Sequence, residues 1–263
     1  MDEPWAVALY RKSVLKQRKL REIEELLGAT EGLRCLDLGS DNGVVSLLLR
    51  RRGGRWASAD LTPEAVAAIR GLVGEDVHEL GGAQLPFPDS EFDRVVVVDM
   101  LEHVVDEAAF CRELLRITKP GGRLLVNTPH LKKSWLRKVR QSLGQTDEKH
   151  GHLRPGYTPA GLEGLLAPGF RPLGAHTYSR AFTEVVDTMI QVGVEALGKK
   201  GSRKGLVVTG DDVASHAKLF GAYALVYPVV AAFSSLDALI PWTSGYMLIA
   251  AFERVSGGGE KAI

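Results

Sequence analysis

Short apolar runs alternate with longer segments of helical periodicity along most of this chain. The run at 92–100 is almost wholly apolar, as expected for a central parallel strand covered on both faces. The other predicted strands lie at 33–38, 56–59, 77–80, 123–127, 169–178 and 246–254. The predicted helices lie at 5–27, 62–73, 106–118 and 131–143, with another beginning at Thr158-Pro159. This order predicts an α/β fold whose sheet is mostly parallel and carries helices on both faces.

The stretch from Leu33 to Asp60 is a strand, a glycine turn, a helix and a second strand. Gly39 and Gly43 flank the turn, where the missing β-carbons allow a tight backbone and the close approach of a ligand. The helix ends in three arginines and Gly53, and the second strand stops at Asp60. An acid at that place can accept hydrogen bonds from ribose hydroxyls, which predicts a nucleoside ligand.

Several segments together resemble the class I S-adenosylmethionine-dependent methyltransferases over about residues 30–175. They are Asp37-Leu38-Gly39 with Gly43, Asp60, Leu85-Pro86-Phe87, Phe92-Asp93, Leu101-Glu102-His103-Val104 and Lys119-Pro120-Gly121-Gly122. The resemblance implies a Rossmann-like, doubly wound sheet of seven strands and S-adenosylmethionine as cofactor. It also implies that the helix at 5–27 covers the cofactor. The implied cofactor contacts are Asp37, Gly39, Ser40, Asp41, Gly43, Asp60, Leu61, Ala83, Gln84, Asp99 and Met100.

Two positions depart from the family pattern. Asp41 stands where the middle glycine of the turn usually lies, and it could accept from the cofactor's ammonium group or crowd its methionine end. We favour the first alternative because the flanking glycines are kept. The loop after the third strand has Gly81-Gly82 where relatives carry an acid, so adenine contact would rest on Ala83 and Gln84.

The active site should open where the fourth strand ends, because ligands bind outside the carboxyl ends of strands in such sheets. His103 is the first candidate for a general base towards an oxygen acceptor, His152 the second, and Glu102 would orient. A purely structural histidine at 103 is the alternative. Glu102, His103, His150 and His152 are also residue types that bind divalent ions, but no spacing rule supports a metal site, and we predict none.

Two later segments suggest an apolar acceptor. The helix at 131–143 carries Trp135 and leucines on one side and basic residues around the other, so it suits an anionic bilayer, a phosphorylated substrate, or packing on the domain. The run 219–236 has no charges but contains Pro228, which argues against a membrane span. A membrane-surface contact or lid, and core or dimer packing, remain open for this run. We expect a small, apolar or lipid-like acceptor, methylated at oxygen.

The predicted organisation is a cap helix, a cofactor-binding core, a helical insertion before the last strand, that strand, and a disordered tail. These parts span residues 1–28, 29–178, 179–240, 241–255 and 256–263. The basic residues of the cap helix are interpreted as a solvated face, and no site is placed there.

Composition narrows the context. The 263 residues carry a formal net charge of +1, which argues against a surface that coats nucleic acid. Two cysteines form neither a disulfide framework nor a metal motif, and no secretion signal is evident at the start, so we expect the mature chain to begin at Met1. We expect a cytoplasmic enzyme, with contact to the inner membrane surface and formation of a homodimer as alternatives for its apolar surface. The alternative is a degenerate domain that serves as an interaction module.

Overall fold

A seven-stranded sheet forms the centre of the protein, in the order β3-β2-β1-β4-β5-β7-β6. The computed structural model describes residues 4–81, 84–132, 134–147, 149, 151–196 and 217–255. The strands are β1 (Arg34–Leu38), β2 (Arg55–Asp60), β3 (Val77–Glu79), β4 (Phe92–Val98), β5 (Thr118–Pro129), β6 (Phe170–Tyr178) and β7 (Met247–Arg254). All neighbours pair in parallel except β7, which runs antiparallel to β5 and β6. The predicted Rossmann-like sheet is confirmed.

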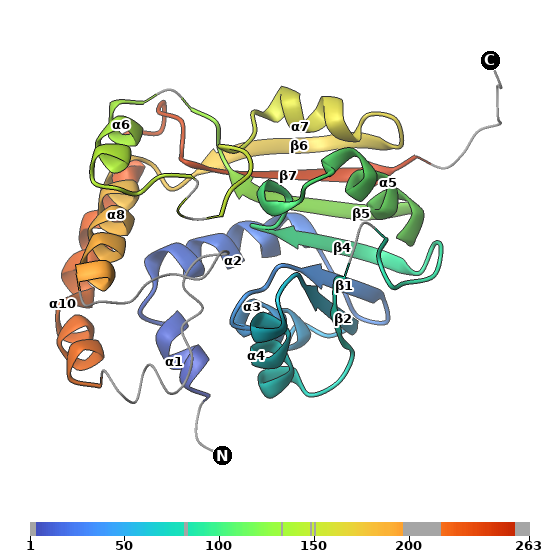
Figure 1. Cartoon of the computed structure of the whole chain (residues 1–263), viewed down its shortest axis with the longest axis horizontal. Helices are drawn as coiled ribbons and strands as arrows, with labels where there is room; N and C mark the ends of the chain where they lie inside the picture. Colours follow the sequence, from blue (N-terminus) through green and yellow to red (C-terminus); the bar gives the residue numbers. More distant parts are fainter. Residues whose placement is uncertain are drawn as a thin grey trace.

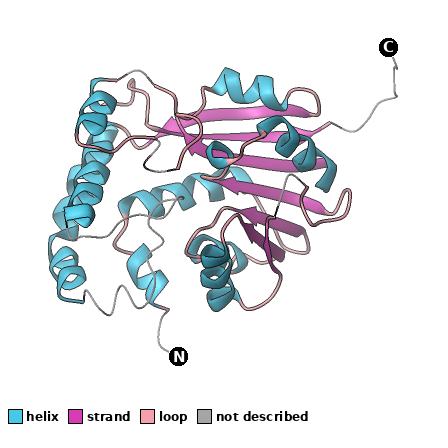
Figure 2. Ribbon diagram, viewed as in Figure 1, coloured by secondary structure: helices cyan, strands magenta, loops and turns pink. Residues whose placement is uncertain are grey.

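Helices cover both faces of this sheet (Figures 1 and 2). One face carries α1 (Trp5–Tyr10), α2 (Val14–Leu27) and α3 (Val44–Arg50), with α4 (Pro63–Val73) beside α3. The other face carries α5 (Glu107–Ile117) and α7 (Pro159–Leu166). Successive residues of the central strands enter opposite cores, for example Val95 and Val97 on one side and Val96 and Val98 on the other. This explains why the predicted central strand is apolar throughout.

Three further helices lie together beyond the carboxyl ends of β4 and β5 (Figure 1). They are α6 (Trp135–Ser142), α8 (Ala181–Ala196) and α10 (Ala217–Ser235), and the short turn η2 (Leu236–Leu239) follows α10. α8 packs against both α6 and α10. We call these three helices the helical cap. The predicted insertion before the last strand is thus helical where the structure describes it, while its basic turn at 199–204 lies outside the described residues, as does the tail 256–263.

Two boundaries differ from prediction. The helix expected at 5–27 is two helices, because the Ser13 side chain accepts a hydrogen bond from the Lys16 amide and begins α2 afresh. The turn expected at Lys119–Gly122 lies within β5, which already starts at Thr118. Gly121 takes the left-handed conformation there, and the pairing with β4 shifts register between Phe92 and Arg94.

Candidate active site

A cavity of about 270 Å³ opens between the carboxyl edge of the sheet, helix α2 and the helical cap. From the sheet edge it receives the turn after β1, the end of β4 and the segment after β5. From the cap it receives charged and amide side chains of α6, α8 and the loop that follows α6. The lining includes Lys16, Lys19, Gly39, Ser40, Asp41, Asn42, Asp99, Glu102, His103, His130, Lys132, Arg137, Arg140, Gln145, Asp147, His152, Glu184, Asp187, Gln191 and Tyr246.

Asp37 does not line this cavity, and its predicted contact with the cofactor stays a prediction. Its side chain is fully buried, and it accepts hydrogen bonds from the hydroxyls of Ser40 (2.5 Å), Ser46 (2.6 Å) and Ser58 (2.8 Å). Arg50 forms an ion pair with it at 3.4 Å. Burial raises the pKa of Asp37, whereas these partners favour the ionised form. Asp37 therefore fixes the turn from behind.

The two glycines of the turn are required by packing within the protein. A β-carbon at Gly39 would lie 2.2 Å from the Val98 carbonyl oxygen, and one at Gly43 would lie 2.7 Å from the Ile69 α-carbon. Both residues also have a positive φ. Asp41 has a φ of 57°, so it occupies a left-handed position that a glycine would tolerate more easily. Gly39, Ser40 and Asp41 line the cavity, while Gly43 starts α3 behind them, and their contacts with the cofactor stay predictions.

Asp60 ends β2 beside this turn. One carboxylate oxygen accepts from the Asp41 amide at 3.2 Å and the other from the Leu61 amide at 2.6 Å. The residue is fully buried, so a ribose could reach it only after the Asp41 segment shifts. Its contact with a ribose stays a prediction.

Of the remaining residues predicted to contact the cofactor, some line the cavity and others do not. Asp99 lines the cavity, whereas Met100 is fully buried in the core, and its contact with the cofactor stays a prediction. Leu61 packs on the same core, and Gln84 is exposed outside the cavity. Ala83 lies outside the described residues.

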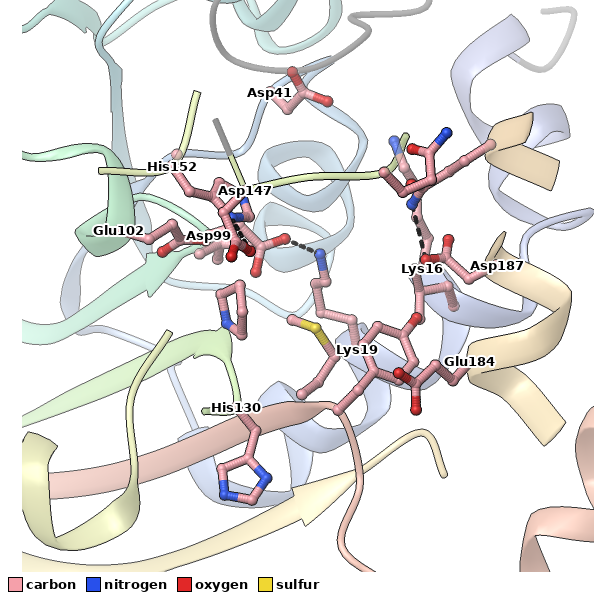
Figure 3. Close-up of a pocket in the computed structure, with 18 of the residues that line it drawn as sticks. Lys16, Lys19, Asp41, Asp99, Glu102, His130, Asp147, His152, Glu184 and Asp187 are labelled. Atoms are coloured by element: carbon pink, nitrogen blue, oxygen red, sulfur yellow. Dashed lines mark hydrogen bonds and ion pairs between the residues drawn. The ribbon is translucent and has the colours of Figure 1, made fainter. Parts of the chain in front are cut away.

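Helix α2 supplies cavity residues where none were predicted. Lys19 forms an ion pair with Asp99, which raises the pKa of Lys19 despite its burial (Figure 3). Burial lowers the pKa of Lys16, although nearby Asp41 opposes the shift. Asn127 also donates to Asp99 at 2.7 Å. The interpretation of the N-terminal basic cluster as a wholly solvated face is therefore wrong for Lys16 and Lys19.

The three predicted catalytic residues come together at the cavity. Glu102 and His103 lie on the turn η1 (Leu101–His103), and His152 comes from the loop between α6 and α7. The rings of His103 and His152 meet edge to face with centroids 4.9 Å apart. Glu102 is fully buried, and burial together with the Asp99 charge raises the pKa of its carboxyl to about 8. His150, the fourth residue considered for a metal, lies outside the described residues.

The cap side of the cavity is polar, which the sequence did not reveal. Ion pairs join Lys132 to Glu184 (2.8 Å), Arg137 to Asp147 (2.6 Å) and Arg140 to Asp187 (3.6 Å). Among the described residues, several buried polar atoms of this wall have no hydrogen-bond partner. They are Gln145 Oε1 and Nε2, Gln191 Oε1 and the Tyr246 hydroxyl.

The outer side of the cap is apolar. Trp135 on α6 is 71% exposed, and Leu225 and Val229 on α10 are 83% and 71% exposed. By length and composition the stretch Gly221–Leu239 could cross a membrane, and only 6% of it is buried in the protein. The described part of the uncharged run is therefore not a core helix, although its inner side packs on α8. The basic residues expected together on one side of α6 point in two directions. Arg137 and Arg140 line the cavity, whereas Lys138 is exposed to solvent.

Comparison with known proteins agrees with this geometry. Residues 36–126 match a family model described as a methyltransferase domain. A demethylmenaquinone methyltransferase of Mycobacterium sp. (strain KMS) is 37% identical over 108 residues, which cover 40% of this chain and 46% of the relative. A ubiquinone biosynthesis O-methyltransferase of Xanthomonas oryzae pv. oryzae (strain PXO99A) is 36% identical over 107 residues, which cover 37% of this chain and 43% of the relative. The chain thus spans less than half of either relative.

Among solved structures, the cyclase SpnF superposes with a TM-score of 0.61 at 21% identity, covering 92% of this chain and 82% of that protein. This likeness concerns the fold, and a shared fold does not fix the chemistry. The matched family does not favour a degenerate interaction module. By its family match and its sheet order, the segment 36–126 is the core of a class I methyltransferase domain, a family whose cofactor is S-adenosylmethionine.

Proposed function

We propose that this protein is a methyltransferase that moves the methyl group of S-adenosylmethionine to an oxygen of a small acceptor. One observation carries the proposal: the turn after β1 of the methyltransferase domain and the Glu102–His103 turn after β4 line the same cavity. Ligands of such sheets bind at this edge. The names of the curated relatives, both concerned with quinones, support an acceptor of that general kind.

The cofactor would lie along the turn at Gly39–Asp41, with its ribose towards Asp60 and its adenine towards Leu61 and Gln84. Charged side chains at the other end of the cavity can bind the methionine part of the cofactor. Lys16 and Lys19 can attract its carboxylate, and Asp41 can attract its ammonium group. When bound, this cofactor supplies an activated methyl group. The protein then has to hold the acceptor in line with it and to exclude water.

The polar groups on the cap side of the cavity indicate what the reactive part of the acceptor looks like. Buried amide and hydroxyl groups without partners are costly, so a ligand that hydrogen-bonds to them gains affinity. Gln145, Gln191 and Tyr246 offer both donors and acceptors. We therefore narrow the expected apolar acceptor to an amphiphile, whose hydroxylated head group enters the cavity and whose apolar remainder stays outside.

The acceptor hydroxyl has to lose its proton as its oxygen attacks the methyl carbon. The new C–O bond forms while the C–S bond breaks, and the electron pair of that bond returns to sulfur. His103 and His152 line the cavity where β4 ends. In this proposal they receive or direct that proton. His103→Ala should lower turnover by about 10²- to 10⁴-fold with little change in cofactor affinity.

Calorimetry with S-adenosylmethionine tests the proposal first. We expect one site per chain, and Asp60→Ala should weaken binding by about 1.5–3 kcal/mol if the carboxylate meets the ribose. Glu79→Ala, at the end of the neighbouring strand β3, is a matched acidic control that should bind normally. Transfer of labelled methyl groups to a panel of hydroxylated quinone precursors then tests the acceptor. Absence of cofactor binding by the unmodified chain would overturn the proposal.

We also propose that the outer face of the cap rests on a membrane at the cytoplasmic side. Support comes from the arrangement of α6, in which Arg137 turns inward and Trp135 outward, opposite to a helix packed by its apolar side. Exposed apolar residues continue over α8 and α10. Lys138 adds an exposed cation to this face, which favours anionic lipid.

Liposome flotation tests this surface. Leu225→Gln with Val229→Gln should abolish flotation, whereas Val255→Gln, an exposed apolar residue after β7 at the opposite edge of the sheet, should leave it unchanged. Because most cations of α6 are paired inward, salt should weaken binding less than the loss of these apolar side chains does. No flotation together with a stable dimer in solution would instead assign the face to a second copy of the chain.

A further inference from the structure

Three metal-binding side chains gather at the end of β4. One ligand atom each of Glu102, His103 and His152 lies within 4.8 Å of the other two. The loop with His152 is tied to the turn η1 by a hydrogen bond from the Leu153 amide to the Glu102 carbonyl, 2.9 Å long. The backbone itself therefore holds residues from two distant segments together.

The Glu102 carboxylate is only half satisfied. One oxygen accepts from the Thr128 hydroxyl at 3.2 Å, while Oε1 is buried and has no hydrogen-bond partner among the described residues. The whole residue is inaccessible to solvent and yet lines the cavity. A buried carboxylate oxygen without a partner is energetically costly, so binding a proton donor or a cation there would be favourable.

His103 is oriented in the manner of a metal ligand. His103 Nδ1 lies 3.0 Å from the Gly151 carbonyl oxygen, which can only accept, so the Nδ1 proton is donated. The lone pair is then on Nε2, and this pattern of one ring nitrogen fixed by a carbonyl is usual for metal-bound imidazole. On the other ring, His152 Nδ1 lies 3.9 Å from the Asp147 carboxylate.

We propose that Glu102 Oε1, His103 Nε2 and His152 bind one divalent transition-metal ion, with Zn²⁺ as the best match. Two imidazoles and one carboxylate form a ligand set that suits such ions and leaves coordination positions open. Ligand atoms of a bound ion lie about 3–3.5 Å apart, so the three side chains close by about 1–2 Å around it.

This site deepens the proposed function, on which its catalytic role rests. An acceptor hydroxyl bound at an open position would lose its proton to water more easily, because the ion stabilises the resulting oxyanion. The oxygen then attacks the methyl group as described above. His103 thereby acts as a ligand rather than as the free base.

Titration of Zn²⁺ into the dialysed full chain, followed by calorimetry, tests the site, and the visible absorption of Co²⁺ gives a second reading. We expect one ion per chain. Glu102→Gln and His152→Ala should each lower the metal affinity by at least about tenfold, because mutating even a residue that only hydrogen-bonds to a metal ligand has an effect of that size. His130→Ala is the matched control. His130 lines the same cavity with Nδ1 2.9 Å from the Gly245 carbonyl, but it lies outside the cluster.

S-adenosylmethionine binding is measured on the same samples. A chain that binds the cofactor without stoichiometric metal, or with unchanged metal affinity in a folded His152→Ala variant, overturns the metal site alone. A chain that binds the metal without the cofactor overturns the proposed function and leaves the metal site standing.

Discussion

The sheet edge and the helical cap face each other across one cavity, but they satisfy their polar groups in opposite ways. At the sheet edge, Asp37 has three hydroxyl partners and an arginine, and Asp60 accepts from two backbone amides. On the cap, both side-chain polar atoms of Gln145 and one of Gln191 are buried without a partner among the described residues. The acids of the turn after β1 and of the end of β2 are thus satisfied by the protein's own groups, whereas Glu102 Oε1 and the two amides on the opposite side of the cavity are not fully satisfied by the described residues.

The two regions also differ in where their apolar surface lies. The sheet edge buries its apolar residues in the core, while the cap exposes Trp135, Leu225 and Val229 on its outer side. A helix that turns charge inward and apolar groups outward needs a polar ligand on one side and an apolar partner on the other. We therefore expect the loss of Asp37 to affect mainly stability, and the loss of an unpartnered amide such as Gln145 to affect mainly acceptor binding.

The largest effect is expected at Asp37. Asp37→Ala leaves three buried hydroxyls without their acceptor and removes the carboxylate that pairs with Arg50, so it should lower the free energy of unfolding by about 3–5 kcal/mol in urea denaturation. Arg52→Ala is the control, because its pair with Glu24 lies at the surface and should contribute under about 1 kcal/mol. Equal costs in the two variants would mean that Asp37 does not hold the turn.

Gln145→Leu should behave in the opposite way. Its stability should be unchanged or higher, because the variant removes a buried amide whose side chain has no partner. Its kcat/KM for the acceptor should fall about tenfold or more, while cofactor affinity stays the same. A clear loss of stability would show that this wall is part of the frame and would remove the contrast between the two regions.

Asp41→Gly has a smaller effect and decides between the alternatives left open by the sequence. Stability should change by under about 1 kcal/mol, because relief of the left-handed backbone is offset by the greater freedom of glycine in the unfolded chain. Calorimetry should show weaker cofactor binding if the carboxylate holds the ammonium group. Tighter binding would mean that Asp41 crowds the methionine end.

The fold was predictable because its signals are local. Apolar runs, the glycine turn and the Thr-Pro helix starts at Thr62 and Thr158 each depend on neighbouring residues, and the structure confirms these elements. Part of the site followed too, since Asp99, Glu102 and His103 lie where one strand ends.

The cap wall was not predictable, because it depends on tertiary contacts. Nothing near Lys132 in sequence indicates a partner on α8, yet it pairs with Glu184. The periodicity of α6 separated two faces of the helix but could not tell which one turns inward. For the same reason the sequence could not show that Asp37 and Met100 are buried away from the cavity.

Hydrogen exchange in the presence of S-adenosylhomocysteine tests directly whether the cofactor binds at the carboxyl edge of the sheet. We expect slower exchange at residues 39–43 and 60–61, where the turn and the end of β2 would close on the ligand, and little change at 135–142 in the cap until an acceptor is added. Protection confined to the cap, or none at the sheet edge, would contradict the assignment of the cofactor to this edge.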